Sequence, residues 1–164
     1  MLITEEDIVT LPEGDPGKAL EKLKAMIGLG ALKQSIVQHL SYVYFIRERQ
    51  KHGFDDTLPP LNMIFSGNPG TGKMTVAKMM GEIYHSVGIL LRPNVTVQDG
   101  RQLTGDGGLT PQQGAEVLMN GAAGGILYID HADVLPRSEW GLALFEALLS
   151  NLSTEECGDT IVVL

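Results

Sequence analysis

Seven residues from Gly67 to Lys73 read G-N-P-G-T-G-K, which has the G-x-x-x-x-G-K spacing of a phosphate-binding loop. In such a loop the backbone amides from about Gly70 to Lys73 converge on phosphate groups, and the positive end of the following helix adds to the attraction. Glycines let the backbone approach closely, and the lysine ammonium neutralises the outer phosphates. The alternative is a generic glycine-rich turn, but an apolar run before the loop and a helical pattern after it favour phosphate binding.

The residue after the lysine departs from this pattern. A serine or threonine is expected there, because its hydroxyl helps to hold Mg²⁺ beside the nucleotide, and Met74 stands in its place. A thioether is a soft ligand and suits poorly a hard cation that prefers octahedral oxygen. Thr75 follows, but a shift of one residue turns a helical side chain by about 100°, so it does not simply substitute. We expect phosphate binding to survive and magnesium binding to be weakened.

A second candidate is Asp130, which ends the apolar run I-L-Y-I-D. An acid at the end of a buried strand downstream of a phosphate loop often holds Mg²⁺, usually through water. The alternative is an aspartate that caps a helix or stabilises a loop, and the pairing with the phosphate loop favours the metal role. A metal site from Asp130, His131 and Asp133 is also conceivable, although adjacent residues on a strand point to opposite faces.

Helices and strands that alternate along the chain must position these residues. We expect helices at 16–28, 30–53, from about Gly72, from Pro111 and at 138–152, and strands at 61–67, 94–99, 124–130 and 159–164. This alternation predicts βαβ units and therefore an α/β fold, whose mainly parallel sheet is covered on both faces. Residues 1–15 are acidic and contain proline and glycine, so we interpret them as a lead-in or linker.

Apolar residues at helical spacing indicate which faces are buried. The predicted buried positions are Leu32, Ile36, Leu40 and Val43 in the helix at 30–53, and Val76, Met79, Met80 and Ile83 in the helix after the loop. Ser138 is a plausible N-cap for the last helix.

Composition limits the kinds of partner. The formal net charge of −8 over 164 residues argues against nucleic acid or an anionic membrane as the main partner. The single cysteine, Cys157, has no internal disulfide partner, which fits a reducing cytoplasm. No apolar run approaches the roughly 20 residues of a membrane helix, and the acidic N-terminus lacks the features of a signal peptide. We therefore expect a cytoplasmic domain.

Three segments together resemble the AAA+ ATPases: M-I-G-L-G-A-L-K-Q-S-I at 26–36, the loop with its flanks at 62–90, and G-G-I-L-Y-I-D-H-A-D-V-L at 124–135. The most similar branch contains stage V sporulation protein K and the red-type rubisco activase. The resemblance covers about residues 20–164 and implies a three-layer P-loop NTPase fold, the AAA+ large subdomain, over residues 16–164. Because the chain stops inside an expected strand, we expect a fragment that lacks the last strand and the helical lid.

The resemblance also implies a set of site residues. Ile27 and Gly28 would lie against adenine, and Asp130 would be the metal-side acid. The residues expected along the phosphates are Asn68, Pro69, Gly70, Thr71, Gly72, Lys73, Met74 and Thr75. The absence of an N-K-x-D segment after the loop agrees with adenine rather than guanine.

Two further positions depart from the family pattern. His131 stands where the family carries the glutamate that polarises the attacking water. It is either a non-catalytic residue at a vacated position, which we favour, or a working base. The segment Gly105–Gly108 takes the place of the pore loop, and its glycines offer no firm grip on a polypeptide, so a flexible surface loop is expected.

Three functions remain open from the sequence. The first is a degenerate AAA+ domain that binds ATP or ADP, hydrolyses it weakly or not at all, and has a regulatory or scaffold role in a larger protein or ring. The second is an active ATPase that remodels a protein partner, with His131 and Thr75 compensating for the losses. The third is an interaction module that no longer binds nucleotide.

Overall fold

A computed structural model describes residues 30–58, 60–103, 105, 108–152 and 160–164, together with Glu21, Leu23 and Ala25. The helices are α3 (Gly30–Lys51), α4 (Lys73–Ser86), α5 (Pro111–Gly121) and α6 (Glu139–Leu152), with 3-10 helices η1 (Gly100–Gln102) and η2 (Ala132–Arg137). The strands are β1 (Val95–Asp99), β2 (Ile126–Asp130) and β3 (Ile161–Val163). The lead-in at 1–15, most of the helix expected at 16–28, and Cys157 lie outside the described residues.

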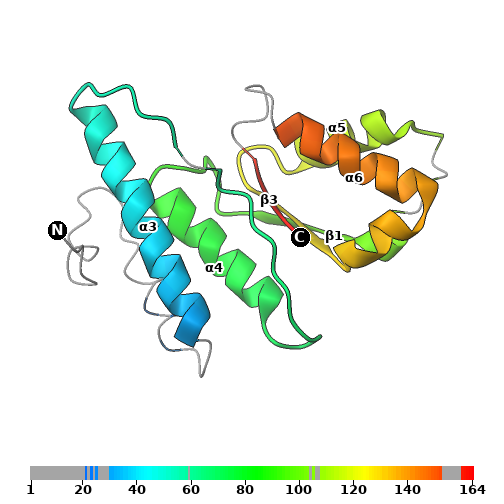
Figure 1. Ribbon diagram of the computed structural model, residues 1–164, viewed down its shortest axis with the longest axis horizontal. Coiled ribbons are helices and arrows are strands. Elements are labelled where there is room, and N and C mark those ends of the chain that lie inside the picture. The colour runs from blue at the N-terminus through cyan, green and yellow to red at the C-terminus, as the bar shows by residue number, and fades with distance from the viewer. Residues whose placement is uncertain are drawn as a thin grey trace.

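The sheet has the order β1-β2-β3, and both neighbouring pairs are parallel. Val95 of β1 is in register with Ile126 of β2, which is in register with Ile161 of β3. Met63 extends the sheet by one parallel bridge to Val163. The predicted α/β fold with a parallel sheet is confirmed (Figure 1).

The prediction of a buried strand at 61–67 is wrong in its extent and in its burial. Among the described residues, its backbone hydrogen bonds to the sheet are made with β3 and the following Leu164: the Met63 and Phe65 amides donate to the carbonyls of Val162 and Leu164, and the Leu164 amide donates to the carbonyl of Met63. The side chain of Ile64, between the two donors, is 80% exposed. In the described part of the chain this segment lies at the sheet edge, and a continuous apolar run does not reveal that one face is uncovered.

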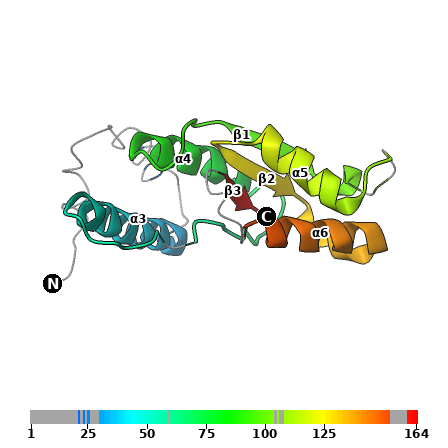
Figure 2. The same cartoon turned by 90° about the horizontal axis from the view of Figure 1, so that it is seen from above.

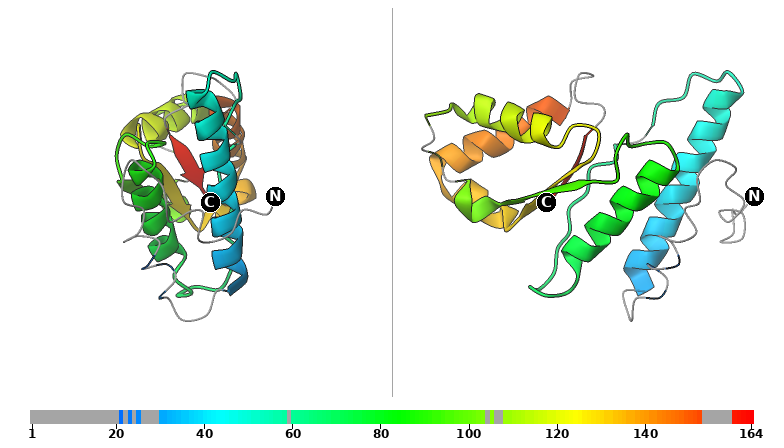
Figure 3. Two further views of the ribbon diagram at one scale, coloured as in Figure 1. Left: turned by 90° about the vertical axis from the view of Figure 1, so that its left-hand side faces the viewer. Right: turned by 180° about the vertical axis from the view of Figure 1, so that it is seen from behind.

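Helices cover both faces of the sheet, as expected for three layers. Ile126 and Tyr128 of β2 pack in one core with residues of α3 and α4, whereas Leu127 and Ile129 pack in a second core with residues of α5 and α6. Side chains alternate in direction along a strand, so one strand supplies both cores. Figures 1, 2 and 3 show α3 and α4 separated by the sheet from α5 and α6.

The helices begin and pack much as their sequences predict. The buried residues of α3 are Ile36, Leu40, Val43 and Ile46, and those of α4 include Val76, Met80 and Ile83, with Met79 partly buried. The predicted N-cap of α6 is confirmed, since the Gly141 amide donates to Ser138 Oγ at 3.0 Å. None of the described helices is long and apolar enough to cross a membrane.

Candidate functional site

The glycine-rich loop leads from the edge of the sheet directly into α4. Gly70 and Gly72 have φ values of 77° and 87°, a left-handed conformation that glycine adopts without the steric cost borne by other residues. Gly72 is the N-cap residue of α4, and it makes no side-chain cap. Because glycine has no side chain, Gly72 does not cap the first backbone amides of α4. An anion that binds at a helix N-terminus uses these amides as its hydrogen-bond donors.

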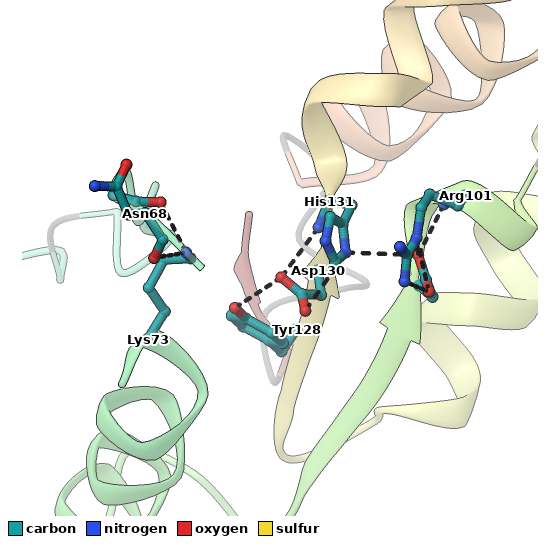
Figure 4. Close-up of polar contacts among 8 residues, drawn as sticks. Asn68, Lys73, Arg101, Tyr128, Asp130 and His131 are labelled. Atoms are coloured by element: carbon teal, nitrogen blue, oxygen red, sulfur yellow. Dashed lines mark hydrogen bonds and ion pairs between the residues drawn. The ribbon is translucent and has the colours of Figure 1, made fainter. Parts of the chain in front are cut away.

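Lys73 is held by its own loop. Its Nζ donates to the carbonyl oxygens of Gly67 at 2.9 Å and Asn68 at 3.1 Å (Figure 4). The Thr71 hydroxyl donates to the same Asn68 carbonyl at 2.8 Å. Phosphate oxygens carry negative charge and accept stronger hydrogen bonds from an ammonium than neutral carbonyls do. The ammonium is thus close to the loop and can exchange its carbonyl partners for phosphate.

A cavity of about 860 Å³ brings most of the predicted residues together. Its loop side is formed by Gly67, Pro69, Gly70, Gly72, Lys73, Met74 and Thr75. The opposite side includes Tyr128, Asp130, His131 and Asp133, and apolar side chains such as Ile64 and Phe145 complete the wall. Asn68 and Thr71 do not line this cavity, and Ile27 and Gly28 lie outside the described residues. The volume is in the range of small-molecule sites.

Met74 and Thr75 both line this cavity, and Met74 is 36% exposed. The donor set fits the two parts of a magnesium nucleotide unequally. Loop amides and the Lys73 ammonium suit phosphate oxygens. For magnesium, Asp130 offers a hard carboxylate oxygen, but the thioether at position 74 does not.

The carboxylate of Asp130 stands at the end of β2 and is half-buried. Its Oδ1 accepts a hydrogen bond from the His131 amide at 3.1 Å and another from the Tyr128 hydroxyl at 3.4 Å. The buried ring and the nearby Asp130 carboxylate raise the pKa of Tyr128, so its hydroxyl stays protonated and donates. The position predicted for the metal-side acid is thus occupied by an oriented carboxylate.

The ring of His131 lies beside two carboxylates. Its Nδ1 is 3.7 Å from Asp99 Oδ1 and 3.5 Å from Asp130 Oδ2, and it is buried with no hydrogen-bond partner among the described residues. His131 also has φ 54°, an uncommon left-handed conformation for a residue other than glycine. In Figure 4 the His131 ring lies between Asp130 and Arg101, so Asp130 stands between this ring and Lys73.

The alternative metal site from Asp130, His131 and Asp133 is wrong. No group of three or more histidine, cysteine, aspartate or glutamate side chains in the described residues is placed to hold a metal ion. The carboxylate of Asp133 instead pairs with Arg137 at 2.7 Å, one turn further along the chain. The expectation that Asp130 and His131 point to opposite faces is also wrong, because His131 follows the end of β2 in a left-handed conformation and its ring lies beside the Asp130 carboxylate.

Sequence reasoning missed Asp99 and Arg101. Asp99 ends β1 as Asp130 ends β2, and the two are register partners. The Arg101 guanidinium donates to both Asp99 oxygens, and these hydrogen bonds hold the pKa of Asp99 down at about 2. The acid at the end of the expected strand 94–99 was the available signal, because ligand sites of parallel sheets gather at the carboxyl ends of the strands.

The stretch at 100–110, in which the flexible surface loop was expected, is partly packed in its described residues. Gly100–Gln102 forms η1, and a Cβ added to Gly105 would lie within 2.5–2.9 Å of atoms of the Trp140 indole. Gly105 therefore rests against α6, and the lack of a side chain is what permits this contact. Thr104, Asp106 and Gly107 lie outside the described residues.

Comparison with known proteins identifies relatives over most of the chain, although no protein-family model matches the sequence. Protein CbbX of Cereibacter sphaeroides is 34% identical over an alignment of 168 positions, which covers 98% of this chain and 54% of that protein. A chloroplastic ribulose bisphosphate carboxylase/oxygenase activase of Cyanidioschyzon merolae is 33% identical over 86% of this chain and 49% of its own length. Stage V sporulation protein K of Bacillus subtilis is 28% identical over 85% of this chain and 44% of its own.

The chain spans about half the length of these relatives. The similarity includes the loop, the helix after it and the strand that ends at Asp130, which are the elements that form the cavity. On these grounds the chain is a relative of the AAA+ ATPases.

Proposed function

We propose that the chain is a degenerate AAA+ nucleotide-binding domain, which binds ATP or ADP and hydrolyses ATP weakly or not at all. The observation that carries the proposal is a single cavity with the phosphate loop and Lys73 on one side and Asp130 on the other. Binding and hydrolysis depend on different residues of this cavity.

Nucleotide binding relies on groups that the sequence keeps. The left-handed Gly70 and Gly72 shape the loop, the N-terminus of α4 faces it, and the Lys73 ammonium already lies among its carbonyls. Together these donors stabilise a polyphosphate through backbone amides and one cation. Ile27 and Gly28 complete the proposal as the contacts to adenine.

Hydrolysis relies on groups that the sequence replaces. When bound, magnesium would neutralise the charge that develops on the phosphates, with Asp130 as its carboxylate ligand. Met74 offers no oxygen beside Asp130, which weakens that site. The ring of His131 lies against Asp99 and Asp130, and its Nδ1 makes no hydrogen bond in the described part of the chain. This placement supports a residue at a vacated position more than a base aimed at a water molecule.

A domain of this kind would act through protein contacts. The relative from Cyanidioschyzon merolae is an activase of ribulose bisphosphate carboxylase/oxygenase, so its name points to a protein target. By analogy we propose a regulatory or scaffold role in the cytoplasm, with a protein partner or other AAA+ subunits. The alternatives are an active ATPase that remodels a partner and an interaction module without nucleotide.

Titration of the chain with a fluorescent ATP analogue, competed by ATP and ADP, tests the proposal. We expect saturable binding, and Lys73→Ala should weaken it by at least about tenfold, since a charge-assisted contact is worth about 1.5–3 kcal/mol. Lys78→Ala, which removes an exposed lysine from the same helix, is the matched control and should bind like the parent.

Phosphate release measured on the same samples separates the alternatives. The proposal predicts turnover at background level despite saturation with ATP. Turnover that Lys73→Ala abolishes would support an active ATPase. No binding at millimolar ATP would support the interaction module.

A further inference from the structure

The charged side chains that line the cavity are few and unevenly placed. Lys73 is on the loop side, and the carboxylates of Asp130 and Asp133 are on the opposite side. The Lys73 ammonium donates to the carbonyl oxygens of Gly67 and Asn68, and in the described part of the chain it makes no ion pair with either aspartate. A phosphate bound at the loop therefore has one lysine beside it and carboxylates across from it.

The two hydrogen-bond donors at the Asp130 carboxylate are already used. Its Oδ1 accepts from the Tyr128 hydroxyl at 3.4 Å and from the His131 amide at 3.1 Å. Tyr128 is 2% exposed and packs in the core that it shares with α4, so its hydroxyl is held in place. A hydroxyl that donates its single proton to Asp130 presents only lone pairs to another ligand. Tyr128 and Asp130 therefore offer acceptors to a phosphate oxygen, which needs donors.

The arginines near this edge of the sheet are paired with other carboxylates. Arg137 donates to Asp133 at 2.7 Å, and Arg101 donates to Asp99 at 2.6 Å. Neither arginine lines the cavity. Arg137 thus offsets the charge of Asp133, whereas neither arginine forms an ion pair with Asp130 in the part of the chain that the structure describes.

The His131 ring and a magnesium ion do not compensate Asp130 on its cavity side either. The ring lies between Asp130 and Arg101, so Asp130 stands between the ring and Lys73 (Figure 4). The lining does not fit a magnesium ion, because Met74 offers no oxygen and the described residues place no group of three or more histidine, cysteine, aspartate or glutamate side chains to hold a metal. The charge of Asp130 therefore acts on whatever binds at the loop.

We infer that the cavity selects a nucleoside diphosphate over the corresponding triphosphate. The inference rests on the proposed nucleotide site. The loop amides and Lys73 provide the donors and the cation for two phosphates. A third phosphate brings a further negative charge to the side of the cavity where Asp130 stands, and like charges a few ångströms apart repel. The poor fit to magnesium leaves this repulsion unscreened by a metal ion, so the terminal phosphate is disfavoured.

Isothermal titration of ADP and of ATP, both in EDTA, tests this selectivity in the parent chain and in Asp130→Asn. The variant removes the charge and keeps the oxygen that accepts from Tyr128 and His131. In the parent chain ADP should bind about tenfold more tightly than ATP. In Asp130→Asn the affinity for ATP should rise about tenfold, and the affinity for ADP should change by less than about twofold. Asp130→Ala, which also lacks the charge, should give the same result.

Glu146→Gln is the matched control, because it also removes one negative charge, from an exposed residue of α6 that does not line the cavity. It should leave the preference for ADP intact. ATP binding as tight as ADP binding in the parent chain overturns the inference, and so does a preference that survives in both Asp130 variants or an equal loss of both nucleotides in them. Absence of binding of either nucleotide by the parent chain refutes the proposed function, and the inference falls with it.

Discussion

Asp99 and Asp130 end two neighbouring parallel strands at the same register position, so their carboxylates share the carboxyl edge of the sheet. Arg101 neutralises the first, and the His131 ring lies beside both. The two acids at this edge therefore have different surroundings: Asp99 is paired with Arg101, whereas Asp130 lines the cavity. This difference supports our proposal that Asp130, rather than Asp99, would be the metal-side acid.

Removing Arg101 should release Asp99. In Arg101→Ala the pKa of Asp99 should rise from about 2 toward its ordinary value of 3.8, because hydrogen bonds from Arg101 are the largest cause of the lowering. The stability that the pair contributes is present above the ordinary value and is lost as pH falls toward the folded-state pKa. Carboxyl chemical shifts followed by NMR titration measure the change, and an unchanged Asp99 would contradict this explanation.

Gly100 should not tolerate a side chain. A Cβ there would lie 2.6 Å from the carbonyl oxygen of His131, which is backbone and has little freedom to move. Gly100→Ala should therefore lower the free energy of unfolding by about 1–3 kcal/mol. Gly121→Ala is the control, because a Cβ at the end of α5 meets nothing within 4 Å. Urea unfolding of both variants checks the difference, and equal stabilities would disprove this packing.

Gly105 and Gly108 form a matched pair for the segment before α5. Both have positive φ, at 82° and 70°, but a Cβ on Gly105 would overlap the Trp140 ring, whereas one on Gly108 meets nothing within 4 Å. Both alanine variants should show the left-handed cost of roughly 1–2 kcal/mol. Only Gly105→Ala should also shift the emission of Trp140, the single tryptophan of the chain. The same emission change in both variants would argue against the contact.

His39 should make stability depend on pH. Its ring packs edge-on to Tyr84, with centroids 6.2 Å apart, and desolvation lowers its pKa from 6.5. The unfolded chain then binds a proton that the folded chain resists, so stability falls as pH drops below 6.5. His39→Phe should flatten this slope between pH 8 and pH 5, and His52→Phe, at an exposed residue just after α3, should not. Urea unfolding across that pH range measures the slope of stability against pH. A slope that His39→Phe leaves unchanged would contradict this role of His39.

The helices were predictable where apolar residues recur at helical spacing or where a capping residue marks the start of the helix. The stripe through Ile36, Leu40 and Val43 predicted α3, and Ser138 predicted the start of α6. The exposure of the edge segment at 61–67 was not predictable, because its apolar run is the same whether or not a neighbouring layer covers Ile64. Local patterns report which residues are apolar, and only the tertiary arrangement decides which of them are covered.

The site was predictable where a motif fixes the geometry. The motif spacing predicted Lys73 in the loop, and the end of an apolar run predicted Asp130 at the end of a strand; both residues line one cavity in the structure. The roles of Tyr128 and Asp99 were not predicted, because they depend on strand register and on contacts between side chains from different elements. Neither has a spacing signature of its own.

We propose that the loop still binds nucleotide and that Met74 has weakened the dependence of this binding on magnesium. Isothermal titration of ATP into the parent chain and into Met74→Thr, each in EDTA and in MgCl₂, tests it most directly. We expect similar affinities in both buffers for the parent, and a gain of about tenfold from Mg²⁺ in Met74→Thr, equal to roughly 1.4 kcal/mol. Strong magnesium dependence in the parent that Met74→Thr leaves unchanged would contradict it.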